Sequence, residues 1–335
     1  MSTEESFRLR PKQSPTTGRA LKLFSYFAGL VTFIATLALV VVAITIAVAA
    51  LPNTEWFTAV RYGLFVASGF IVFVAAKAFG YFNRWGKRHL ATFADDVLAK
   101  DSRPAILYLR SFADDEAVYR EEEEFVQVLN TWGPVVAIGR PGESLPPLGA
   151  SRFYVADSDW QAFVSNLMRK SRLVFILAGK TPGLTWELQE CRALIEPQRL
   201  IVIVPRDRTA YETFRTTAKA ATDLKLPEFP VPPERERHAC RWLGVIMFNA
   251  DWVASYVPVR IPERKEYAAY EAFGAEYAWR AKFRNVLHPV ASAVGLTSAP
   301  LPPHPSSGSV RWSRFFNWIV IVGLIFWVLI QLLRH

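Results

Sequence analysis

The sequence has few of the residues that make covalent cross-links or metal sites. Its 335 residues include two cysteines, Cys191 and Cys240, and five histidines scattered along the chain. Two cysteines form no disulfide framework and are typical of a reducing compartment. His238 and Cys240 are too closely spaced and too isolated for a zinc site, so we predict no bound metal. The sequence also offers no Ser-His-Asp set.

The standard nucleotide-binding fingerprints are also missing. Neither G-x-G-x-x-G nor G-x-x-x-x-G-K-[ST] occurs in the chain, which excludes a dinucleotide-binding turn or a P-loop of the standard kind. A nucleotide site in this protein must therefore be built from other residues.

Apolar residues, by contrast, are abundant. They make up 51% of the chain, and the mean hydropathy is +0.15, which is more apolar than an ordinary soluble domain. Three runs, at residues 22–51, 59–82 and 315–333, approach or exceed the roughly 20 residues that cross a bilayer. The first is too long for a signal-peptide core. We predict three transmembrane helices, and a buried core hairpin stays the alternative for the first two.

Positive charges flank these runs on one side. Arg19 and Lys22 stand at the start of the first run, Arg84 and Lys87 follow the second, and Arg314 precedes the third. Because cytoplasmic span ends are enriched in Lys and Arg, we expect a multi-pass inner-membrane protein whose N-terminus and central region are cytoplasmic. Attraction to anionic lipid explains the net charge of +9. The lipid bilayer is thus an expected partner, and nucleic acid is not.

The predicted spans divide the chain into six parts. They are a cytoplasmic tail (1–21), a two-helix transmembrane hairpin (22–82), a juxtamembrane helix (83–103), an α/β domain (104–288), a Pro/Ser-rich linker (289–314) and a C-terminal transmembrane helix (315–335).

Apolar runs alternate with helical patterns inside the α/β part. The expected strands are 105–109, 134–138, 172–177, 200–204 and 244–248, and the expected helices are 117–131, 158–170, 182–196 and 208–222. Several strands are continuous apolar runs, as in a parallel sheet covered on both faces. The pattern predicts a doubly wound parallel sheet of the flavodoxin type. In such sheets ligands bind beyond the carboxyl ends of the strands.

Polar and glycine-containing segments follow three of these strands, and we expect them on one rim. The residues concerned are Arg110, Ser111, Asp114, Gly139, Arg140, Gly142, Trp186, Glu187 and Glu190. Taken singly, each has a structural alternative: acidic residues favour a helix start, and Pro and Gly suit a loop.

Taken together, these segments resemble the Toll/interleukin-1-receptor (TIR) domain and its bacterial TIR-like relatives. ILYLRSFADDE (106–116) resembles the first-strand box, in which a hydrophobic strand is followed by Ser and then Asp. GRPGE (139–143) stands where the family's loop after the second strand carries Arg and Pro-Gly. SRLVFIL (171–177) and TPGLTWELQE (181–190) are similar to its third strand and its Trp-containing helix start with a downstream Glu. The likeness covers about residues 104–205.

The resemblance implies a membrane-anchored effector, because some family members cleave the nicotinamide–ribose bond of NAD with one glutamate. It implies NAD as a substrate and no resident cofactor. By spacing from Trp186 the catalytic residue would be Glu190, and the neighbouring Glu187 is the alternative. A carboxylate stabilises the positive charge that builds on the ribose. The implied nucleotide-binding residues are Arg110, Ser111, Asp114, Gly139, Arg140, Gly142 and Trp186, with arginine pairing to the pyrophosphate.

A second hypothesis is a non-enzymatic module that self-associates in the membrane. Ala59, Gly63 and Ala67 recur every four residues in the second apolar run, a spacing typical of helix–helix packing sites. Packing of these small residues against the first run is the alternative.

Overall fold

The computed structural model of the protein describes residues 9–48, 55–111, 122–123, 125–231, 242–259, 283 and 286–296. The chain divides into two compact units. Residues Gln13–Leu90 belong to a helical unit, and an α/β unit holds Met1–Lys12 together with Ala91–His304.

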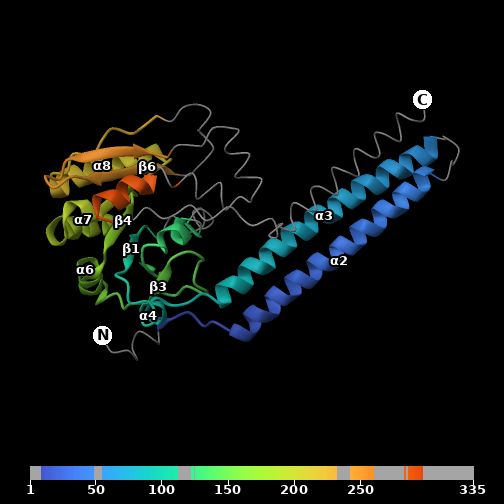
Figure 1. The fold of residues 1–335 in the computed structure, drawn as a ribbon, viewed down its shortest axis with the longest axis horizontal. Coiled ribbons are helices and arrows are strands. Elements are labelled where there is room, and N and C mark those ends of the chain that lie inside the picture. The colour runs from blue at the N-terminus through green and yellow to red at the C-terminus, as the bar shows by residue number, and fades with distance from the viewer. Residues whose placement is uncertain are drawn as a thin grey trace. The chain divides into compact units, whose positions relative to one another are not determined.

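The helical unit contains a long antiparallel hairpin. Helix α2 (Pro15–Val48) and helix α3 (Glu55–His89) lie side by side along their length (Figure 1). The helices approach closely at two glycines: a Cβ atom on Gly18 would lie 2.9 Å from His89 Cβ, and one on Gly86 would lie 2.9 Å from the Gly18 carbonyl oxygen. Only glycine fits at this crossing. Farther along, Phe24 and Phe82 meet edge to face with centroids 5.1 Å apart.

One helix among the described residues is long and apolar enough to cross a membrane by length and composition. It is the Pro15–Ala38 part of α2, of which 11% is buried. Helix α3 contains the second predicted run, but over its described residues it is not apolar enough to count as a candidate span. The third predicted run lies outside the described residues. Among its described residues the structure thus contains one candidate span, where the sequence predicted three.

The helix boundaries also differ from those expected. Helix α2 begins at Pro15, inside the predicted tail, and α3 continues to His89. The expected juxtamembrane helix is therefore the end of α3 followed by the short helix α4 (Ala94–Leu98). Charged residues of the NRWGKRH segment are compatible with helix, so nothing in that segment breaks α3 where the apolar run stops.

The α/β unit is built on a seven-stranded sheet with the order β3-β2-β1-β4-β5-β6-β7. Its strands are β1 (Ile106–Leu109), β2 (Val135–Ile138), β3 (Ser151–Phe153), β4 (Leu173–Leu177), β5 (Leu200–Pro205), β6 (Trp242–Phe248) and β7 (Ala254–Pro258). The first five strands are parallel, and β6 and β7 are antiparallel to their neighbours. The sheet is thus mixed, and the expectation of a purely parallel sheet was wrong for the 244–248 strand. An apolar run predicts a buried strand but not its direction.

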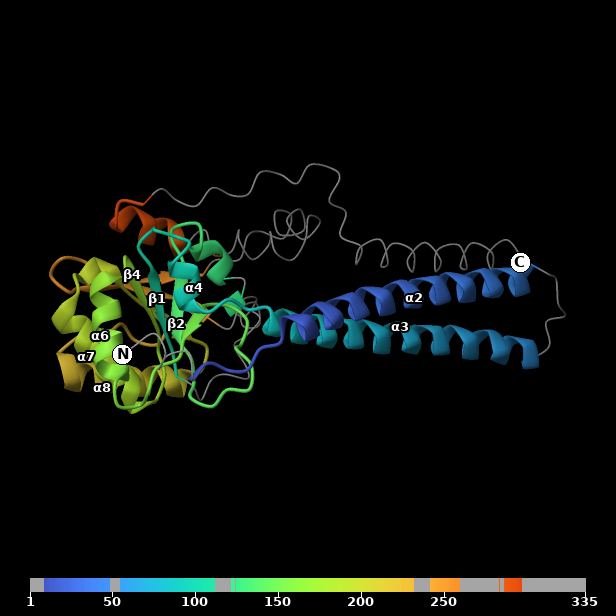
Figure 2. The ribbon, with the colours of Figure 1, turned by 90° about the horizontal axis from the view of Figure 1, so that it is seen from below.

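Helices cover both faces of the sheet. Helices α6 (Trp160–Lys170), α7 (Pro182–Leu194) and α8 (Arg208–Thr222) pack on the face that carries Leu107 and Leu109. Helical residues 125–129 and 286–293 pack on the opposite face, with Ile106 and Tyr108 (Figure 2). Val290 and Ala291 are fully buried there, so the core extends past the predicted boundary at residue 288.

Local sequence explains two of the helix starts. Pro182 occupies the first turn of α7, where its missing N–H needs no partner. Asp207 caps α8 by accepting a hydrogen bond from the Ala210 amide at 3.1 Å. The backbone N–H groups at this cap lower the pKa of the Asp207 carboxyl. Helix α6 begins after Asp159, whose side chain makes no cap hydrogen bond.

Candidate functional site

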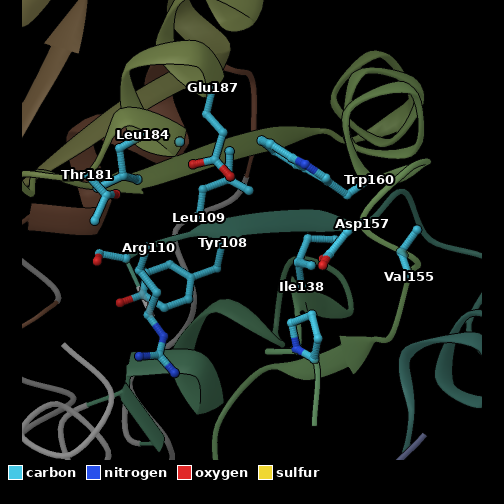
Figure 3. Close-up of a pocket in the computed structure, with 14 residues that line it drawn as sticks. Tyr108, Leu109, Arg110, Ile138, Val155, Asp157, Trp160, Thr181, Leu184 and Glu187 are labelled. Carbon is cyan, nitrogen blue, oxygen red and sulfur yellow. The ribbon is translucent and has the colours of Figure 1, made fainter. Parts of the chain in front are cut away.

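A pocket lies where the strand order of the sheet reverses. From β1 the chain moves outward to β2 and β3, whereas β4 lies on the other side of β1 and leads to β5. In open α/β sheets the carboxyl ends of the two strands at this switch point flank a crevice. The pocket there has a volume of about 280 Å³ and is walled by the ends of β1 and β2, the segment after β3 and the start of α7 (Figure 3).

Glu187 is the carboxylate of the pocket wall on α7. It stands in the second turn of the helix, and its side chain extends from α7 into the pocket above Leu109 (Figure 3). The residue is partly buried, and burial raises the pKa of its carboxyl to about 8. An empty pocket at pH 7 therefore holds Glu187 mostly in its neutral form. A cation next to it favours the ionised form.

The opposite wall comes from the segment after β3. Asp157 and Trp160 both line the pocket, and the Trp160 indole extends toward the same space as Glu187 (Figure 3). Behind it, Trp186 packs edge to face on Trp160, with ring centroids 4.7 Å apart and an interplanar angle of 72°. Trp186 is absent from the pocket lining. Trp186, an implied nucleotide-binding residue, therefore supports the pocket-lining ring of Trp160 instead of lining the pocket itself.

Arg110 reaches the pocket at the end of β1 but takes part in a buried ion-pair cluster. Its Nε lies 3.1 Å from Glu122 Oε2, and Arg152 Nη2 lies 3.2 Å from Glu122 Oε1. All three side chains are buried: Arg110 is 5% exposed, Glu122 is 0% exposed and Arg152 is 1% exposed. The guanidinium of Arg110 turns away from Glu187 (Figure 3). Its charge is therefore partly compensated by Glu122 before any ligand binds.

The remaining predicted residues divide into two groups. Ser111 and Gly139 line the pocket together with Arg110 and Glu187. Arg140 and Gly142 are exposed on the loop after β2 and do not line it, although Gly142 has the left-handed φ of 76° expected of a loop glycine. Asp114 lies outside the described residues.

Glu190 points to a different neighbour from Glu187. It does not line the pocket, and its Oε2 accepts a hydrogen bond of 2.6 Å from Ser165 Oγ on α6. Three residues along an α-helix rotate a side chain by about 300°, so Glu190 is turned by about 60° relative to Glu187. That rotation, together with the packing of α6 on α7, places Glu190 at the helix–helix contact. The two carboxylates therefore do not share the pocket.

Sequence reasoning did not identify the pocket role of Asp157 and Trp160. Both follow β3, a strand of three residues, Ser151–Phe153, which is too short to produce a periodic signal. A short apolar stretch, FYV at 153–155, precedes an acidic segment and Trp160. This pattern, a short apolar run followed by acidic residues and an aromatic residue, is the sequence signal that could have indicated a strand end on the same rim.

Within the described parts of the chain, no group of three His, Cys, Asp or Glu side chains is arranged to hold a metal ion. No protein-family model, curated protein or solved structure matches this chain.

Proposed function

We propose that this protein is a membrane-anchored enzyme that binds NAD, or a closely related nucleotide, in the switch-point pocket and cleaves its N-glycosidic bond. Glu187 is the proposed catalytic carboxylate. The observation that carries the proposal is the position of this carboxyl in the pocket, with burial raising its pKa to about 8. A carboxyl that is neutral in the empty site and ionises beside a cation suits a substrate with a positively charged ring.

The proposed reaction uses the ability of Glu187 to ionise beside a positively charged ring. The C1′–N bond of the nicotinamide riboside breaks, its electron pair moves to the nicotinamide nitrogen, and water adds to C1′ with loss of a proton. Positive charge therefore passes from the ring to the ribose in the transition state. Ionised Glu187 stabilises it through a fixed negative charge, and Trp160 offers an aromatic wall to the nicotinamide. The pocket volume of about 280 Å³ is near the lower limit of about 300 Å³ for small-ligand sites and suits the nicotinamide–ribose half.

The helical hairpin is the proposed membrane anchor. Large apolar side chains of both helices face outward: Leu23, Phe27, Val66 and Phe70 are 72%, 63%, 68% and 66% exposed. Such a surface needs an apolar environment. Because cations gather at the end of the hairpin where α2 begins and α3 ends, we propose that the hairpin spans the inner membrane with the α/β unit in the cytoplasm.

The test is release of nicotinamide from NAD by the full-length chain reconstituted in liposomes. We expect turnover by the wild-type protein and a loss of about 100-fold or more in Glu187→Gln, the size seen when one charge-stabilising group is removed. Glu190→Gln, which changes the next carboxylate on the same helix, is the matched control and keeps most of the activity.

Two results would contradict this assignment. If Glu190→Gln abolishes turnover and Glu187→Gln retains it, Glu187 is not the catalytic carboxylate. If the wild-type protein releases no nicotinamide at any protein density in the liposomes, the protein is not an NAD-cleaving enzyme.

The second outcome favours the non-enzymatic candidate, self-association in the membrane. Gly63 and Ala67 are exposed on α3, and a Cβ atom on Gly63 meets no other atom within 4 Å among the described residues. Among the described residues they therefore make no contact with α2, which leaves this face of α3 for a second helix in this candidate function.

A further inference from the structure

One wall of the pocket is a loop whose position depends on Tyr154. Gly139 and Pro141 in the loop after β2 line the pocket. The Tyr154 hydroxyl donates a hydrogen bond of 2.8 Å to Glu143 Oε2, and Glu143 Oε1 accepts one of 3.1 Å from the Arg140 amide. Glu143 thus closes the loop on itself, and Tyr154 fixes Glu143.

The ring of Tyr154 also fixes the start of this loop. Tyr154 is 3% exposed, and a Cβ atom on Gly139 would lie 2.4 Å from its Cε1 atom. The ring therefore packs directly on the Gly139 backbone, and only glycine permits this approach. A movement of the ring toward the loop therefore pushes on Gly139, a residue of the pocket wall.

On its other side Tyr154 contacts the chain segment that follows the helical hairpin in sequence, and that segment in turn contacts the one that precedes the hairpin. Phe93, four residues after the end of α3, packs edge to face on Tyr154 with centroids 6.0 Å apart. Arg10, five residues before the start of α2, lies over the Phe93 ring at 4.6 Å. Arg10 Nη2 also pairs with Asp95 Oδ2 at 2.6 Å, and its Nη1 lies 3.7 Å from Asp96 Oδ2. The Arg10 side chain is 13% exposed.

These contacts form a continuous set from Arg10 through Phe93 and Tyr154 to the pocket loop. We propose that Arg10 and Tyr154 are positioning residues for the loop Gly139–Glu143, so that a change in the chain segments next to the hairpin alters the pocket wall. Arg10 acts through Phe93 and Tyr154 rather than by touching a ligand. The proposal concerns the loop itself and holds for any ligand of the pocket.

Hydrogen–deuterium exchange of the full-length chain in lipid nanodiscs tests this without a ligand. Tyr154→Phe keeps the ring and removes the bond to Glu143, so we expect the amides of residues 139, 140, 142 and 143 (Pro141 has none) to exchange about 3- to 10-fold faster. Arg10→Met keeps an apolar stem and removes the charge, so the same amides exchange about 2- to 5-fold faster. Arg10→Lys retains the charge and restores the wild-type rate to within about twofold.

The matched control is Arg215→Met, which removes an ion pair of 2.8 Å between Arg215 and Glu212, both on α8. It leaves exchange in 139–143 unchanged. The proposal is overturned if Arg10→Met speeds exchange at residues 93–98 but not at 139–143. It is equally overturned if both Arg10→Met and Tyr154→Phe speed exchange across β1 and β4 as much as in the loop, since that pattern reports general destabilisation.

Discussion

Replacing Glu187 by glutamine should stabilise the α/β unit, and increasingly so as the pH rises. Burial raises the pKa of the Glu187 carboxyl from 4.5 to about 8. The folded protein therefore holds a proton that the unfolded chain releases between these two values, and stability falls as the pH rises through this window. Glutamine has the same shape and cannot ionise, so the variant does not lose this stability.

The magnitude follows from the two pKa values. One pKa unit corresponds to about 1.4 kcal/mol, and integrating over the titration gives a loss of about 0.9 kcal/mol at pH 5 and about 3.4 kcal/mol at pH 7. Because the side chain keeps part of its exposure, solvent screening makes these values upper bounds. We expect the difference in unfolding free energy between Glu187→Gln and wild type to grow by about 1 to 2.5 kcal/mol from pH 5 to pH 7. At about 2–4 °C per kcal/mol for a unit of this size, Tm differences near 5 °C result.

The assay is thermal unfolding of the full-length chain in nanodiscs at pH 5, 6, 7 and 8, followed by tryptophan fluorescence. Gln189→Glu is the matched control, because Gln189 is exposed on the same helix. In Gln189→Glu an amide and a carboxyl are exchanged at a position where water solvates both groups. The Tm difference between Gln189→Glu and wild type should therefore stay constant with pH. A Tm difference for Glu187→Gln that is equally constant, or that shrinks toward pH 8, would refute the buried-carboxyl reasoning.

Two further predictions concern the pocket and its support. Glu122→Gln leaves Arg110 and Arg152 buried without their carboxylate and should lower the unfolding free energy by about 3–5 kcal/mol. Glu123→Gln, which changes a part-exposed neighbour, is the control. An equal Tm for the two variants would contradict the ion-pair role of Glu122. Under the proposed reaction, kcat/KM for NAD rises about tenfold per pH unit below pH 8 and levels off above it, because the free enzyme must ionise Glu187. A rate that falls over this range would assign catalysis to a protonated group.

The strands and helices that position the pocket were largely predictable from the sequence. Four of the continuous apolar runs became β1, β2, β4 and β5, and the helices at 182–196 and 208–222 agree with α7 and α8 within two residues. These elements are buried or strongly amphipathic, so their residue patterns report their environment directly. Arg110, Ser111, Gly139 and Glu187, which the sequence placed on one rim, line one pocket in the structure.

Other features depend on contacts that no local pattern contains. The short strand β3 exists because Val136, Ala137 and Ile138 of β2 offer it a partner, and Trp160 stands at the start of the helix that follows this strand. Spacing from Trp186 favoured Glu190 over Glu187, but the packing of α6 against α7 decides which carboxylate faces the pocket. The end of the core at residues 290–291 was missed because the following proline-rich stretch dominates the local composition.

A raised pKa at Glu187 also bears on how the proposed site would release its product. At pH 7 a carboxyl with a pKa of about 8 needs about 1.4 kcal/mol to ionise, and the positive charge of bound NAD supplies a favourable interaction of that order at close range. Once the C1′–N bond has broken, nicotinamide is neutral and that interaction is lost. Protonation of Glu187 is then favoured again, which weakens its hold on the ribose. Under the proposed reaction, the same burial that lowers the stability of the folded protein would let the site distinguish a charged substrate from a neutral product.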